Sequence, residues 1–392
     1  MTMKTTIKYI FPAVLAISFL TPAFAADAPQ RAAPAAVALN LGPGKFLPTY
    51  VGFSPSAQQI CITGDMTDEW GAASARLMLV DRKSNSMAWQ ATMTSPEGVE
   101  RQHAVQCVVA EDRVYLLANG DTSLSPPQAQ TETIVAAYDL HGKRLAQVVV
   151  DLPTAGRHGK TSEVGYAIGA TPDNLQVVGY TRDQDDETEH YGTYTVTLDR
   201  GLKPRGAPLV RHNGAYTGPS AARIVGDSIY VTGRFFKGQV TTNDIGDFSA
   251  SRLRTSGGYV WSTPVKPGPG NGIDMTILED GTSMVFKYAS GATSFSRVTP
   301  DGKATALTKF ASTYCDTSAV ARYGNGVVAV REACAGKGSA LVAIDTVAGI
   351  ETRLRAIPDE PVFVATHGTD WIVLARDKAN KTVFYSGTGG GL

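Results

Sequence analysis

The sequence has 392 residues, equal numbers of acidic and basic side chains, and 43% hydrophobic residues. The export signal described below contains two lysines and no acidic residue, so the chain without it carries a charge of about −2. This balance lacks the basic surface that nucleic-acid binding requires, and DNA and RNA are therefore not expected partners.

The first 25 residues have the features of a secretory signal peptide. Two lysines precede an apolar run from Ile10 to Leu20, and residues 23–25, Ala-Phe-Ala, form a small-residue cleavage pattern. The apolar run is too short to cross a bilayer and no later stretch is long enough, so no membrane span is expected after cleavage. We expect a periplasmic or secreted protein whose mature chain starts near Ala26. A buried N-terminal helix is the alternative.

Seven short apolar segments then recur along the chain, each between a tight turn and a polar loop. The intervals between them are 54, 61, 54, 55, 43 and 44 residues, which is the period of a four-stranded propeller blade rather than of a helical repeat. An eight-bladed ring or an open sandwich would need a repeat that the sequence does not contain. We predict an all-β, seven-bladed β-propeller whose second strands start at Ile60, Val114, Leu175, Ile229, Met284, Val327 and Trp371.

The ends of the chain complete this pattern. The Ala- and Pro-rich residues 26–34 are predicted to be a flexible leader, and residues 35–392 a single propeller domain. The last repeat has room for a third strand but not for a fourth. Val37, Leu39 and Leu41 alternate like a strand, so we expect this segment to pair with the last strand and close the ring.

The ends of the third strands carry an acidic residue, a Gly-containing turn and in places a tryptophan. The stretches are Asp81 with Trp89, Asp139 with Gly142, Gly257 with Trp261, and Asp301 with Gly302. They resemble the repeats of bacterial quinoprotein-like, outer-membrane-assembly and WD40-like propellers. The resemblance implies a propeller over the whole chain, but no particular activity. The periodic Gly-Lys-Trp ending and the vicinal disulfide of quinoproteins are missing, so no cofactor is expected.

Binding residues are expected in the loops that join second to third strands and fourth to first strands, because these loops emerge on one face of a propeller. The long ones belong to the first four repeats. Bulky aromatic residues in these polar loops are predicted to anchor a protein interface; packing against their own loop is the alternative. They are Trp70, Tyr191, Phe235 and Phe236.

A cationic pocket is the second candidate on this face, and it would take a carboxylate, a phosphate or an acidic protein loop. Exposure of each side chain on its own loop is the alternative. The residues are Arg157, His158, Arg211 and His212.

The densest charge cluster runs from Asp183 to His190 and has the oxygen ligands that calcium selects. It lacks the glycine and the spacing of a calcium loop, so we interpret it as a solvated acidic loop. The histidines are scattered, and no metal site is predicted. No nucleophile elbow, phosphate-binding loop or zinc-protease motif occurs, so the sequence offers no catalytic residues.

Four cysteines in an exported chain indicate two disulfides. Cys315 and Cys334 are both expected on one face of the sixth blade and are predicted to pair. Cys61 and Cys107 would then join the second strand of blade 1 to the first strand of blade 2. Free buried thiols are the alternative for this second pair.

The sequence thus favours a non-catalytic binding module that presents its loop face to another envelope protein, as a scaffold, assembly factor, inhibitor or immunity protein. A small-molecule ligand is compatible with the same fold. The alternative is a periplasmic enzyme or enzyme subunit with its site at the central channel: a quinone-type dehydrogenase, a lyase or a hydrolase.

Overall fold

The computed structural model describes residues 37–39, 45–68, 71–122, 130–152, 160–184, 189–211, 216–236, 247–265, 272–289, 292–305, 308–311, 314–333 and 338–388. These residues belong to one compact unit, Pro34–Leu392. All regular elements within them are strands, and no helix capable of spanning a membrane occurs in this part of the chain. The strands form seven four-stranded antiparallel sheets, the blades of a propeller.

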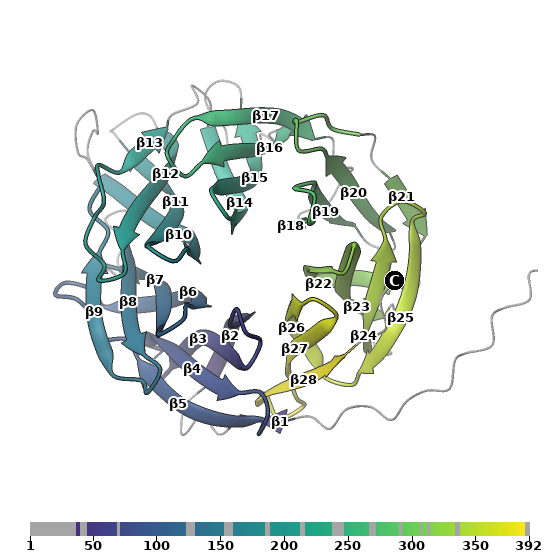
Figure 1. Ribbon diagram of the computed structural model, residues 1–392, viewed down its shortest axis with the longest axis horizontal. Coiled ribbons are helices and arrows are strands. Elements are labelled where there is room, and N and C mark those ends of the chain that lie inside the picture. Colours follow the sequence, from purple (N-terminus) through teal and green to yellow (C-terminus); the bar gives the residue numbers. More distant parts are fainter. Residues whose placement is uncertain are drawn as a thin grey trace, which may run out of the picture. The chain divides into compact units, whose positions relative to one another are not determined.

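Within each blade the strands are called A to D from the centre of the ring outward (Figure 1). Blade 1 contains β2 (Lys45–Phe53), β3 (Gln59–Thr67), β4 (Ala73–Asp81) and β5 (Ser86–Thr92). Blade 2 contains β6 (Arg101–Val109), β7 (Arg113–Asp121), β8 (Thr131–Asp139) and β9 (Arg144–Val149). Blade 3 contains β10 (Lys160–Ala170), β11 (Asn174–Gln184), β12 (Glu189–Asp199) and β13 (Leu209–Arg211). Blade 4 contains β14 (Tyr216–Val225), β15 (Ser228–Phe236), β16 (Asp247–Arg254) and β17 (Tyr259–Val265).

The remaining blades follow the same order. Blade 5 contains β18 (Gly272–Ile277), β19 (Ser283–Ala289), β20 (Ala292–Val298) and β21 (Thr308–Ala311). Blade 6 contains β22 (Tyr314–Tyr323), β23 (Gly326–Ala333), β24 (Ser339–Asp345) and β25 (Ile350–Ile357). Blade 7 contains β26 (Glu360–His367), β27 (Asp370–Arg376) and β28 (Thr382–Thr388). The seven B strands are the seven apolar segments that the sequence predicted.

The two ends of the domain meet in blade 7. The short strand β1 (Val37–Ala38) pairs antiparallel with β28 and supplies the D strand of that blade (Figure 1). The backbone amide of Leu39 adds a hydrogen bond to the carbonyl of Thr382, at 3.2 Å. The predicted closure of the ring by the N-terminal segment is confirmed. Blade 7 therefore has a fourth strand, which covers part of the outer edge of β28.

The hydrophobic core is divided among the seven seams between neighbouring blades. In β3, Cys61 packs toward blade 2, whereas Ile60 and Ile62 pack toward blade 7. In β7, Leu116 likewise faces blade 1 and Leu117 faces blade 3. Because both faces of a B strand are buried, its sequence is continuously apolar rather than alternating. This continuity is why the B strands were the clearest elements in the sequence.

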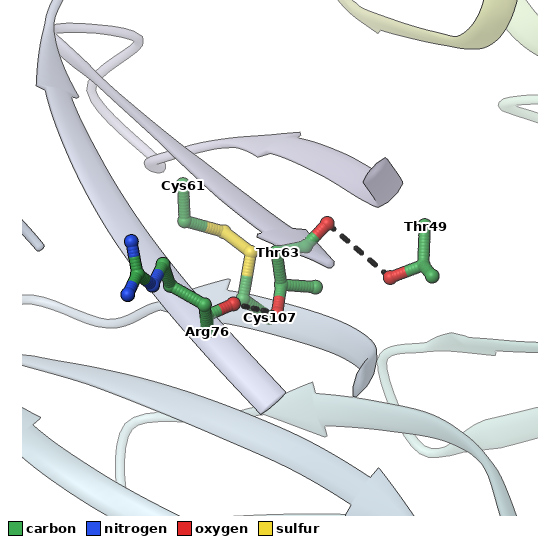
Figure 2. Close-up of a disulfide and its surroundings, with 5 residues drawn as sticks. All are labelled: Thr49, Cys61, Thr63, Arg76 and Cys107. Atoms are coloured by element: carbon green, nitrogen blue, oxygen red, sulfur yellow. Dashed lines mark hydrogen bonds between the residues drawn. A yellow bond between two sulfur atoms is a disulfide. The ribbon is translucent and has the colours of Figure 1, made fainter. Parts of the chain in front are cut away.

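The A strands carry a recurrent irregularity that the sequence did not reveal. In six blades the pairing of strand A with strand B shifts register at an equivalent place, as between Pro48 and Tyr50 in β2. The extra residue there is Thr49, whose hydroxyl donates to the carbonyl of Thr63 (Figure 2). Opposite it lies Gly64, where a Cβ atom would meet the carbonyl oxygen of Leu47 at 2.3 Å. Such bulges twist an inner edge strand and discourage further strand pairing in the channel.

Candidate functional site

The antiparallel order of the strands gives the ring two different faces. The A–B and C–D connections lie on one face, called here the turn face, and the B–C and D–A connections lie on the other, the loop face. The longest loop-face connections join β7 to β8, β9 to β10 and β15 to β16. On the turn face, the two long connections after Leu198 and Val298 fold back through isolated bridges to Pro204 and Ala304. Long loop-face connections thus occur in blades 2 and 4 and between blades 2 and 3, whereas the expected long loops between β3 and β4 in blade 1 and between β11 and β12 in blade 3 are short.

Four of the eight predicted binding residues lie outside the described residues: Trp70, Arg157, His158 and His212. The other four lie in strands, at their loop-face ends. Phe235 and Phe236 were expected in a loop, but β15 continues through both and pairs them with Thr217 and Tyr216. Tyr191, also expected in a loop, lies in β12, and Arg211 ends β13. The prediction of loop positions for these three aromatic residues was wrong, because backbone pairing extends past the apolar part of each strand.

The acidic segment is also shorter as a loop than expected. Residues 185–188 lie outside the described residues, whereas Asp183 pairs with His190 in the register between β11 and β12. The predicted bond between Cys315 and Cys334 is likewise outside the described part, because Cys334 is not in it.

A charged cluster lies on the described part of the loop face, at the seam of blades 1 and 2. The imidazole of His103, near the start of β6, lies between two carboxylates: its Nδ1 is 2.9 Å from Oδ2 of Asp65, and its Nε2 is 3.5 Å from Oδ2 of Asp121. The other oxygen of Asp65 accepts the backbone amide of Ala104 at 2.7 Å. The hydroxyl of Thr131 donates to Asp121 at 3.2 Å. Both carboxylates are therefore held in place around the imidazole.

The electrostatics of this cluster favour the protonated histidine. The hydrogen bond to Asp65 raises the pKa of His103, desolvation opposes this, and attraction to Asp65 and Asp121 adds to the rise. The carboxylates contact opposite nitrogens of the ring instead of converging on one point. Within the described ranges, no three metal-ligating side chains are arranged to hold a metal ion. The arrangement places an imidazole between carboxylates of two blades, with its side chain 45% exposed.

A disulfide lies deeper in the same seam. Cys61 of β3 and Cys107 of β6 are bonded, so they join the B strand of blade 1 to the A strand of blade 2 (Figure 2). Both residues are buried in the apolar seam. The predicted pairing of these two cysteines is confirmed. Asp65 and His103 lie four positions farther along the same two strands, toward the loop face, so the ion pair and the disulfide tie one seam together twice.

The turn face is built from short turns closed by aspartates. The side chains of Asp81, Asp139, Asp199 and Asp345 each accept backbone amides of the turn that follows, in blades 1, 2, 3 and 6. These backbone hydrogen bonds lower the pKa of each carboxyl group. Since the aspartate acts as an acceptor within its own turn, it fixes the C–D connection locally.

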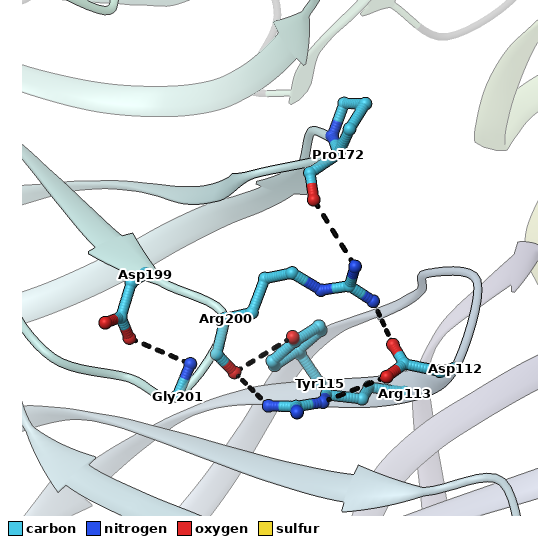
Figure 3. A network of polar contacts seen from close by, with 7 residues as sticks. All are labelled: Asp112, Arg113, Tyr115, Pro172, Asp199, Arg200 and Gly201. Carbon is cyan, nitrogen blue, oxygen red and sulfur yellow. Dashed lines mark hydrogen bonds and ion pairs between the residues drawn. The ribbon is translucent and has the colours of Figure 1, made fainter.

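Arginines next to two of these aspartates reach across to the preceding blade. Arg200 of blade 3 donates to the carboxylate of Asp112 in the A–B turn of blade 2 (Figure 3). The backbone carbonyl of Arg200 accepts hydrogen bonds from Arg113 at 2.6 Å and from the hydroxyl of Tyr115 at 3.1 Å. Side chain and backbone of one turn therefore hold two blades together.

The same relation recurs at the closing seam. Arg82 of blade 1 contacts Asp370 of blade 7 at 2.6 Å and lies over the ring of Phe53, 5.6 Å from its centroid. The sequence signal was available, since an Asp-Arg pair ends the C strand in both blades 1 and 3. It was missed because only the fold shows that the arginine reaches another blade.

Tryptophans make a second repeated contact between blades. Nε1 of Trp89 in blade 1 donates to the carbonyl of Leu140 in blade 2, at 2.8 Å. Nε1 of Trp261 in blade 4 donates in the same way to Pro300 in blade 5, at 3.0 Å. The glycine and tryptophan positions noticed in the sequence thus meet between blades: a tryptophan on one D strand packs under the Gly-containing turn of the next blade.

Comparison with known proteins supports the fold and adds no family. No protein-family model matches the chain, and no curated sequence is similar to it. The propeller domain of a trilobed protease from Pyrococcus furiosus matches with a TM-score of 0.52 and 8% identity, over 89% of this chain and 97% of that one. An oligogalacturonate lyase in complex with manganese matches with a TM-score of 0.52 and 13% identity, over 88% and 89% of the two chains. The archaeal domain has an open velcro topology, whereas β1 closes the ring here. The chain is a seven-bladed β-propeller.

Proposed function

We propose that this chain is an exported, non-catalytic binding protein of the cell envelope that holds another protein against its loop face. The observation that carries the proposal is the difference between the two faces. Turn-face connections of blades 1, 2, 3 and 6 are fixed by aspartate side chains, and ion pairs join blades on that face, while the long connections from β7 to β8, β9 to β10 and β15 to β16 emerge on the loop face. Variable connections on a rigid scaffold are the usual place for recognition.

Export is supported by the signal-peptide features of the first 25 residues and by the Cys61–Cys107 bond. Disulfides form and persist in oxidising compartments such as the periplasm. A partner protein needs roughly 800 Å² on each side for a stable complex. Loops from four adjacent blades can supply a surface of this size, with Trp70 and Tyr191 as aromatic anchors.

Affinity capture from periplasmic extract tests the proposal. The purified mature protein is compared with a variant carrying Trp70→Ala and Tyr191→Ala, and with a control carrying Val225→Ala and Val347→Ala. Val225 ends β14 at the turn face and Val347 lies in the C–D turn of blade 6. They are 50% and 80% accessible, so the control removes apolar surface from the opposite face.

The expected result is a stoichiometric protein partner that the control retains and the loop-face variant loses. Equal loss from both variants would place the interface elsewhere. A protein that captures no partner but turns over a small molecule would instead support the enzyme alternative, and substrate screening would follow.

A further inference from the structure

A cavity of about 620 Å³ opens at the turn-face mouth of the central channel, opposite the proposed protein-binding face. Residues of all seven blades line it, mainly the ends of the A strands and the turns that follow them. Its volume lies in the range of ligand-binding pockets, about 300 to 1,000 Å³. The cavity is therefore large enough for a chain segment of a few residues.

The charged residues that line this cavity are mostly cationic. Arg200, Arg223 and Arg322 come from blades 3, 4 and 6, with His367 from blade 7, whereas Glu111 is the one acidic residue among the lining residues of the described chain. The three guanidinium groups therefore stand at separate positions around the mouth. A ligand carrying several carboxylates could bind to more than one of these guanidinium groups.

Each of these arginines is held from the side by an acid that does not line the cavity. Arg223 contacts Asp274 of blade 5 at 2.7 Å, and Arg322 contacts Glu279 of blade 5 at 3.2 Å. Arg200 also donates to the carbonyl of Pro172, and Arg223 to that of Ala222. A guanidinium has five N–H donors in a fixed fork, so these contacts still leave donors for a ligand. Because the side chains are already ordered, a ligand loses less free energy in fixing them.

An aromatic wall lies beside the arginines, where blades 1 and 7 meet. The ring centroids of Tyr50 and Phe363 are 5.0 Å apart, and those of Phe53 and His367 are 6.1 Å apart. All four residues line the cavity. This wall can accept an apolar or aromatic side chain of a ligand.

Most hydroxyl groups of the lining residues are already hydrogen-bonded within the protein. Ser54 accepts the amide of Gln59 at 3.0 Å, Thr171 bonds to both backbone groups of Asn174, and Thr366 donates to the carbonyl of Arg322. A glycan has a hydroxyl on nearly every carbon and would find few such partners here. Valine and alanine residues of five A strands make up much of the remaining lining. The mixture of spaced guanidinium groups and aliphatic or aromatic surface matches an acidic peptide better.

We propose that the turn-face mouth of the channel binds an acidic peptide segment, with its carboxylates on Arg200, Arg223 and Arg322 and an apolar side chain on the wall of Tyr50, Phe53 and Phe363. The bulged A strands disfavour addition of the peptide as a further strand. Side chains therefore supply the recognition. This site is independent of the loop-face interface and can be tested without knowing that partner.

Fluorescence anisotropy with the labelled peptide Glu-Glu-Phe-Glu-Glu tests the site, with Gln-Gln-Phe-Gln-Gln as the neutral probe. Arg322→Gln removes a cation from the mouth, and Arg297→Gln is its matched control. Arg297 is similarly exposed, 37% against 43%, and it pairs with Asp280, the neighbour of Glu279, but does not line the cavity. A second variant, Ala321→Trp, retains every charge and fills the mouth.

We expect the acidic peptide to bind and the neutral peptide to bind at least tenfold more weakly. Arg322→Gln should weaken binding about tenfold, the usual effect of losing one charge-assisted hydrogen bond. Ala321→Trp should abolish binding, and Arg297→Gln should leave it unchanged. Equal affinity for both peptides, or equal effects of the two arginine variants, would overturn the proposal. Binding of oligogalacturonate without binding of the peptide would assign the site to an anionic glycan instead.

Discussion

Asp65 and His103 meet across the same two strands that the Cys61–Cys107 bond joins, four positions nearer the loop face. The disulfide secures this seam within its apolar interior. The ion pair secures it at the surface, where protonation can alter it. The two ties therefore respond to different conditions, one to reduction and the other to pH.

The His103 contact predicts a pH-dependent contribution to stability. Because the folded protein raises the pKa of His103 above the ordinary value of about 6.5, it holds this proton to higher pH than the unfolded chain does. The stabilisation is therefore complete below about pH 6.5 and is lost as pH rises through the raised pKa. In urea unfolding, His103→Gln should lower the midpoint clearly at about pH 5.5 and much less at about pH 8.5.

His141→Gln is the control for this measurement, because His141 is an exposed histidine in a turn on the opposite face. Its effect on the midpoint should be small at both values of pH. A loss of stability in His103→Gln that does not change with pH would mean that the imidazole acts by packing alone.

The disulfide predicts a loss of stability when both cysteines are replaced. Cys61→Ala with Cys107→Ala frees a loop with a sequence separation of 46 residues, for which loop entropy gives about 4 kcal/mol. In a domain of this size that corresponds to a fall in Tm on the order of 5 °C. Alanine is chosen because both side chains are buried, so a serine would bury an unpaired hydroxyl. If the double variant had the same Tm as the wild type, the bond would not restrict the unfolded chain enough to affect stability.

The tryptophan contact can be separated from backbone strain by a pair of glycine variants. Gly142 and Gly98 have similar positive φ angles, 85° and 80°, but a Cβ at Gly142 would lie 2.9 Å from the indole of Trp89, whereas nothing lies near Gly98. Gly98→Ala should cost about 1 to 2 kcal/mol for the left-handed conformation. Gly142→Ala should cost about 1 to 3 kcal/mol more, because the turn is pushed off the indole. Chemical denaturation of both variants measures the difference, and equal losses would mean that the Trp89 contact adds nothing.

A buried ion pair in blade 6 allows a double-mutant test. Arg331 of β23 is 1% exposed and contacts Glu351 of β25 at 2.9 Å. Removing one partner alone, as in Glu351→Leu, should destabilise the fold by about 3 to 5 kcal/mol, since it takes an acidic partner away from a buried guanidinium. Arg331→Met with Glu351→Leu should recover much of that loss. Additive losses in the two single variants and the double variant would show that the two charges do not act as a pair.

The fold was predictable because its strongest signals are local. Leu116 and Leu117 face different seams and are both buried, so β7 is apolar along its length and visible in the sequence. The C–D turns have Asp and Gly at fixed places, and Val37 shows the alternation of a closing strand. Signals of this kind can be recognised within one repeat, without knowing the residues of the neighbouring blade.

The candidate site was less predictable because it depends on contacts between blades. Asp65 and His103 are ordinary strand residues until the register of β3 against β6 brings them together. Phe235 and Phe236 follow a polar arginine, so the strand seemed to end before them, yet their backbone pairs with β14. The cavity at the turn-face mouth is assembled from all seven blades. No single repeat contains it.

The strand that closes the ring is synthesised first and finds its partner last. Val37 and Ala38 emerge ahead of every blade, but their partners Phe384 and Val383 lie in the final strand of the domain. A chain interrupted before β28 therefore displays an unmatched strand and an open seam. Only a chain that includes β28 can bury both, so the ring closes after the last strand of the domain has been made.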